Sequence, residues 1–120
     1  MAKQPKANNT VVELEMDDGS VVRLTLAYRY LMQLSAKNRA AYDEYNASWR
    51  KKEEKRDEFD NLRFIYTGYL CAAIMDGTFD DTMTWQQFID AAPIDREAVG
   101  MALMGLIAPK RKGASATPSE

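Results

Sequence analysis

The sequence predicts an α+β fold that is mostly helical, with an N-terminal β-hairpin followed by four or five helices. Two short runs of alternating apolar and polar residues flank an Asp-Gly turn near the N-terminus. Apolar residues then recur at three- and four-residue spacing over most of residues 28–107. Thr84 and Asp95 stand where helix N-terminal caps are expected, and Gly77 stands where a C-terminal cap is expected.

The length of 120 residues fits one domain with its own core. We expect residues 1–9 to be a flexible leader, residues 10–108 to form a single α+β domain, and residues 109–120 to be a disordered C-terminal tail. The 16 basic and 18 acidic residues give a net charge of -2, which argues against a nucleic-acid-binding module. No apolar run suggests a membrane span or a secretory signal, so we expect a cytoplasmic protein without membrane contact.

The residue types leave little room for catalysis. Histidine is absent and Cys71 is the only cysteine, which excludes an internal disulfide, a Cys/His metal cluster and histidine-based catalysis. Cys71 lies among apolar residues and is interpreted as a small buried side chain. We therefore predict a protein that is not an enzyme, with no catalytic, cofactor-binding or metal-binding residues.

Only an acidic loop invites a metal interpretation. Asp76, Asp80 and Asp81 surround Gly77, but their spacing does not match a calcium-binding loop. The end of a helix followed by a solvated turn explains them without a bound cation. An enzyme using this loop is the weakest of the functional hypotheses.

The hairpin is predicted within residues 10–26. Three apolar residues of each arm share one face, namely Val12, Leu14 and Met16, and Val22, Leu24 and Leu26. Arg23 and Thr25 are expected on the opposite face. Because a two-stranded hairpin is marginal on its own, it must pack on helices or pair its edge with another chain. Self-association through this edge is therefore one hypothesis.

Two helices should follow the hairpin. The first is expected to begin within residues 25–27, and Asn38 can start the second. Residues 50–58 contain no apolar side chain, so we expect a solvated helix face or an exposed connection. A basic docking surface is the alternative for this segment, although acidic residues interrupt it.

The most apolar segment spans residues 59–75 and should be the central helix. We expect Phe59 within its apolar stripe, and close contact with another element explains Gly68 in its interior. Thr84 and Gln87 form a capping box for a helix over residues 85–92, which Pro93 ends. The last helix should bury Val99, Ala102, Leu103, Leu106 and Ile107.

Aromatic residues on the second predicted helix are the first candidates for partner binding. Tyr42, Tyr45 and Trp49 share one stripe, and tyrosine and tryptophan are enriched at protein interfaces. Packing in the core is the alternative role for each of them. The basic tail residues Lys110, Arg111 and Lys112 are the second set of candidates.

Residues 84–107 also allow a helix-turn-helix, and thus a small DNA-binding regulator, as an alternative function. The first turns of a DNA-reading helix usually carry Arg, Lys, Asn or Gln. Here Arg96 stands among Asp95, Glu97, Ala98 and Gly100. Simple helix packing is therefore favoured, and we expect no nucleic-acid partner.

Four segments in order resemble the tail assembly chaperones of long-tailed, siphovirus-type bacteriophages or prophages of Gram-positive hosts. They read LAYRYLMQLSAKN, then KKEEKRDEFD, IYTGYLCAA and MTWQQF, and the resemblance covers about residues 10–108. It implies a non-enzymatic chaperone that binds the tape-measure protein, keeps it soluble and helps recruit tail-tube subunits. It also implies action in the host cytoplasm, absence from the mature virion, a possible longer frameshifted form of the same protein, and possible homo-oligomers.

Overall fold

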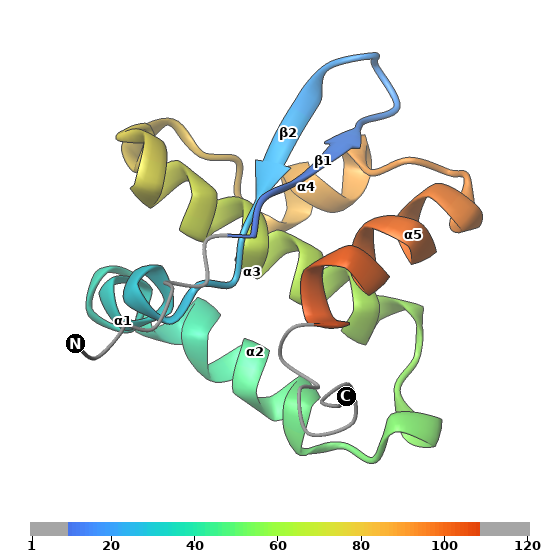
Figure 1. The fold of residues 1–120 in the computed structure, drawn as a ribbon, viewed down its shortest axis with the longest axis horizontal. Helices are drawn as coiled ribbons and strands as arrows, with labels where there is room; N and C mark the ends of the chain where they lie inside the picture. The colour runs from blue at the N-terminus through green and yellow to red at the C-terminus, as the bar shows by residue number, and fades with distance from the viewer. Residues whose placement is uncertain (1–9, 109–120) are drawn as a thin grey trace, which may run out of the picture.

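A two-stranded antiparallel hairpin precedes five α-helices in the computed structural model, which describes residues 10–108 (Figure 1). This confirms the predicted fold class. The strands are β1 (Val12–Glu15) and β2 (Val21–Leu24), and the helices are α1 (Tyr28–Lys37), α2 (Arg39–Arg50), α3 (Glu58–Asp76), α4 (Trp85–Ala91) and α5 (Arg96–Ile107). The expected leader and tail, including Lys110, Arg111 and Lys112, lie outside the described residues.

The hairpin forms as the alternation predicts. Val12 pairs with Leu24 and Leu14 with Val22, and Gly19 adopts the left-handed conformation that the turn needs, with φ of 89°. The apolar face packs on α3 and α5, which supplies the support that an isolated hairpin lacks.

Thr25 corrects one detail of the expected hairpin. We expected its side chain on the outer face, but it is fully buried. The strand has already ended at Leu24, so the alternation no longer applies to Thr25. Its backbone N–H donates to the Gly68 carbonyl at 3.0 Å, and its hydroxyl accepts the backbone N–H of Ala27 at 3.3 Å. These bonds fix the passage from the hairpin into α1.

Local capping signals set the helix ends. Asn38 separates α1 from α2, and its side chain accepts the backbone N–H of Ala41 at 3.1 Å. The capping boxes of α3 and α4 begin at Asp57 and Thr84, and Gly77 ends α3 with φ of 80°. The predicted caps at Asn38, Thr84, Asp95 and Gly77 are thus confirmed.

Helix α3 is central, since it contacts β2 and the other four helices. Gly68 lies where α3 meets α5 and β2, because a methyl group there would stand 3.0 Å from Leu106 and 3.3 Å from Leu24. Phe59 is more than half exposed, contrary to the expected stripe, because it lies in the first turn before α3 enters the core.

The loop between α3 and α4 is fixed by two tyrosines of α3. Within the predicted loop lies a short 3₁₀ turn, Phe79–Asp81. The Tyr66 hydroxyl donates to the Met83 carbonyl, and the Met83 N–H donates to the Tyr69 hydroxyl, both at 2.9 Å. Both backbone groups of Met83 are thereby satisfied, and α4 is held against α3.

Candidate functional site

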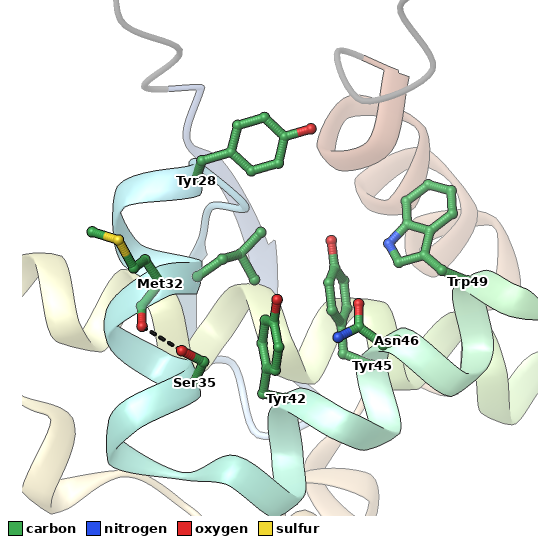
Figure 2. A pocket seen from close by; sticks show the side chains of 8 residues that line it. Tyr28, Met32, Ser35, Tyr42, Tyr45, Asn46 and Trp49 are labelled. Atoms are coloured by element: carbon green, nitrogen blue, oxygen red, sulfur yellow. Dashed lines mark hydrogen bonds between the residues drawn. The ribbon is translucent and has the colours of Figure 1, made fainter.

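A groove of about 560 Å³ lies between α1 and α2. Figure 2 shows Tyr42, Tyr45, Asn46 and Trp49 along α2, with Tyr28 and Met32 across from them on α1. Aromatic and aliphatic side chains dominate the lining, which consists of Tyr28, Leu31, Met32, Ser35, Tyr42, Tyr45, Asn46 and Trp49. The three aromatic residues that we predicted for partner binding therefore meet in one groove.

The α1 side of the groove is open to solvent. Tyr28 is 73% exposed and Met32 is 69% exposed, although both are large apolar side chains. The Ser35 hydroxyl donates to the Met32 carbonyl at 2.7 Å, so this polar group is satisfied within α1. Large apolar side chains that stay exposed beside an aromatic groove are typical of interaction sites.

The floor of the groove belongs to the core. Tyr45 is only 5% exposed, and its ring packs edge to face on Phe64 of α3 at 5.9 Å between centroids. Burial raises the pKa of the Tyr45 phenol well above its ordinary value, so the ring stays neutral at physiological pH. Tyr45 thus shapes the groove, while its main contacts are internal.

Trp49 is held in place by a residue outside α2. The Arg56 guanidinium lies 4.9 Å from the centre of the Trp49 ring and 5.3 Å from that of Phe64. Its N–H groups also donate to the backbone carbonyls of Ser48 and Trp49, at 3.0 and 3.1 Å. Because Trp49 is fixed, a ligand need not order this side chain on binding, and less conformational entropy is lost.

Arg56 differs from most of the charged segment between α2 and α3, residues 50–58, because it is half-buried. Most of residues 50–58 are exposed, as expected, and they include a short 3₁₀ turn, Glu53–Lys55. Arg56 instead packs over Trp49, and Asp57 caps α3. Arg56 thus positions Trp49 in the groove, and Asp57 stabilises the start of α3.

The arrangement favours the docking of an apolar helical segment. An amphipathic helix commonly places its apolar face in a groove between two helices. The walls here offer aromatic and aliphatic surface, and Asn46 and Ser35 add polar groups along the groove. The volume lies within the range of about 300–1,000 Å³ that encloses a few side chains of a ligand.

The aspartates of the acidic loop have structural roles. Asp76 accepts a hydrogen bond from Arg23 of β2 at 2.7 Å, and Asp80 and Asp81 belong to the 3₁₀ turn after α3. Within residues 10–108, no three His, Cys, Asp or Glu side chains converge to form a metal-binding group. Cys71 is buried, as predicted for a small core residue.

Helix α5 offers little that could read DNA bases. Its outer surface carries Glu97, Gly100, Met101 and Met104. Arg96, at its first turn, forms an ion pair with Glu58 at 3.0 Å. Arg96 is the one side chain of α5 with a donor of the kind that contacts base edges.

The sequence did not identify the α1 half of the groove. Tyr28 and Met32 belong to the periodic residues of the first predicted helix and were not among the predicted partner-binding residues. The signal that could have separated them is their spacing, since Leu31 and Leu34 already form the buried side of α1. Which side faces inward depends on contacts with α2 and α3 that lie far along the chain.

Comparison with protein-family models, curated proteins and solved structures finds no match to this chain. Among the described residues, none of the helices is long and apolar enough to cross a membrane.

Proposed function

We propose that this protein is a tail assembly chaperone of long-tailed bacteriophages or prophages, which binds the tape-measure protein and keeps it soluble. The observation that carries the proposal is the aromatic groove between α1 and α2, with Tyr28 exposed on its rim. The resemblance of residues 10–108 to these chaperones supports the choice of family, and the groove is a surface on which a client could bind.

In this proposal, the groove covers apolar side chains of a helical tape-measure segment until the tail is built. Burial of apolar surface contributes about 25 cal/mol per Å² to such a complex, before the entropy lost on association is subtracted. The groove encloses only a few side chains, so each contact is weak and reversible. Weak contacts suit a chaperone that must release its client when tail-tube subunits arrive.

The remaining parts of the proposal concern place and partners. The protein acts in the bacterial cytoplasm, helps recruit tail-tube subunits and leaves before the virion is complete. A longer frameshifted form of the same protein is a possible partner. The basic residues Lys110, Arg111 and Lys112 remain a candidate second contact for the client.

Co-expression with the tape-measure protein tests the proposal. The wild-type chain should raise the soluble fraction of that protein, while a Tyr28→Ser, Asn46→Lys double variant should lose most of this effect. Serine removes exposed aromatic surface from the rim, and lysine places a charge where an apolar segment would be buried. Unchanged solubility with the wild-type chain would refute the chaperone proposal.

A matched control separates the groove from a general effect of surface change. Phe59→Ser with Gln86→Lys likewise replaces one exposed aromatic residue and one amide, but both lie outside the groove. This control should solubilise the client as well as the wild type does. If the groove variant, with an unchanged far-UV spectrum, also kept full activity, the contact surface would lie elsewhere.

Tyr45→Ala is unsuitable for this test. Tyr45 packs against Phe64 in the core, and truncation of a buried aromatic residue costs about 3–5 kcal/mol. A loss of client binding in that variant would therefore report unfolding as much as a lost contact.

A further inference from the structure

Helix α5 has an apolar outer face that no described element covers. Its inner side buries Ala102, Leu106 and Ile107, and the helix packs on β1 and α3. On the outer side, Met101 is 71% exposed and Met104 is 57% exposed. A helix that is apolar around most of its circumference is normally buried on more than one side.

Gly100 on this face has no explanation within the described chain. A methyl group added there would meet no atom within 4 Å, whereas one at Gly105 would stand 3.3 Å from Val12. Glycine in a helix interior costs about 1 kcal/mol relative to alanine. Close approach of a second helix from outside would explain a glycine at this position.

The order of residues on α5 is self-complementary. Residues 100–105 read GMALMG, the same in both directions. Two copies of α5 packed antiparallel about a twofold axis at the centre of this segment would place Met101 of each copy opposite Met104 of the other. A twofold interface requires such a self-complementary surface, and methionine side chains adapt well to one another.

Charge favours the antiparallel arrangement. Glu97 lies at the N-terminal end of the exposed stripe, and Lys110, Arg111 and Lys112 follow the C-terminal end of α5 in the sequence. In an antiparallel pair, Glu97 of one copy lies beside Ala108 of the other, the last described residue, and the basic sequence follows Ala108 along the chain. A parallel pair would instead bring the two Glu97 carboxylates together, which is unfavourable.

We infer that the outer face of α5, formed by Glu97, Gly100, Met101, Met104 and Ala108, binds the same face of a second copy in an antiparallel dimer. This inference does not depend on the proposed chaperone function. It places self-association on α5 and not on the edge of the hairpin.

The mass of the full-length chain in solution, measured by sedimentation or light scattering, tests the inference. The wild-type chain should have twice the monomer mass of 13.6 kDa. Met101→Glu and Met104→Glu should each raise the dissociation constant of the dimer about tenfold or more, because a carboxylate would be buried without a partner. Both side chains are exposed in the monomer, so the variants should fold normally.

Met32→Glu is the matched control, since Met32 is 69% exposed on α1 and lies far along the chain from α5. It should leave the dimer unchanged. A monomeric wild-type chain at its highest soluble concentration would overturn the inference. Unchanged dimers in both α5 variants would overturn it as well, by placing self-association on another surface such as the hairpin edge.

Disulfide trapping tests the orientation. Glu97→Cys and Ala108→Cys lie at opposite ends of the stripe, and the native Cys71 is buried away from it. After the two variants are mixed and oxidised, the mixed disulfide should dominate over disulfides between like chains. Mainly like-chain disulfides would indicate a parallel pair and overturn the antiparallel arrangement. A persistent dimer without any disulfide would place the contact elsewhere.

Discussion

At the scale of single residues, Asp60 is the buried charge that fixes the junction of α2 and α3. Its carboxylate accepts hydrogen bonds from the Ser48 hydroxyl and the Lys51 ammonium, both at 2.8 Å, and from the Asp57 backbone N–H at 3.0 Å. Burial alone disfavours the charged form, but these donors outweigh it and lower the pKa of Asp60 to about 2. The network holds the connection from which Arg56 reaches Trp49.

Asp60 should make stability depend on pH in a defined window. Because its folded pKa is lowered, the stabilisation is fully present above the unfolded pKa of about 3.9 and is lost as the pH falls toward 2. The lowered pKa corresponds to about 2–3 kcal/mol of stabilisation. Urea unfolding should therefore show Asp60→Asn as clearly less stable than the wild type at pH 6, with a difference that shrinks toward pH 2.

Asp43→Asn is the control for this measurement. Asp43 pairs with Arg39 on the exposed surface of α2, where an ion pair contributes about 0–1 kcal/mol. It should change the free energy of unfolding little at any pH. A pH-independent difference between Asp60→Asn and the wild type would contradict the assignment of the low pKa to Asp60.

At the scale of elements, the glycines of α3 and α5 play different parts. Gly68 allows α5 and β2 to approach α3, with Leu106 and Leu24 in the space that a side chain would need. Gly100 has open space beside it. Gly68 therefore marks a contact inside the fold, whereas Gly100 marks a surface that no described residue covers.

Replacement of each glycine by alanine should therefore change stability in opposite directions. Gly68→Ala should destabilise the fold by about 1 kcal/mol or more, because overpacking against Leu24 and Leu106 outweighs the gain in helix propensity. Gly100→Ala should stabilise the monomer by up to about 1 kcal/mol. Chemical unfolding of each alanine variant in the monomeric Met104→Glu background measures the change in the free energy of unfolding. If Gly68→Ala stabilised the fold as Gly100→Ala does, the close packing at Gly68 would be contradicted.

Elements with local signals could be predicted from the sequence, while positions set by distant contacts could not. The caps at Asn38, Thr84 and Asp95 depend on residues within one turn, so the helix starts were predictable. Thr25 and Phe59 were placed wrongly, because their burial depends on where β2 ends and where α3 enters the core.

The candidate groove shows the same division. Its α2 half was predicted from the spacing of Tyr42, Tyr45 and Trp49. The exposure of Tyr28 and the support of Trp49 by Arg56 were not, since they depend on how α1 and the α2–α3 connection pack. A stripe in a helix shows which residues share a face, but only the tertiary contacts show what covers that face.

At the scale of the whole molecule, α3 joins two surfaces built by different elements. Helices α1 and α2 contact α3 and each other, and form the groove, while α5 contacts α3 and β1 (Figure 1). The described residues that line the groove and those that form the outer face of α5 have no member in common. Under the two proposals, a client would bind through α1 and α2 while a second copy pairs through α5.

This separation predicts that the two activities can be lost independently. Tyr28→Ser with Asn46→Lys should keep the mass of a dimer but bind the client poorly. Met104→Glu should be monomeric yet bind a tape-measure fragment with one docking segment as well as the wild type does. On a fragment with two segments, Met104→Glu should bind more weakly than the dimer, because the dimer gains affinity from two linked contacts. Calorimetry with both fragments measures this difference. Loss of single-segment binding in Met104→Glu would show that α5 itself contacts the client.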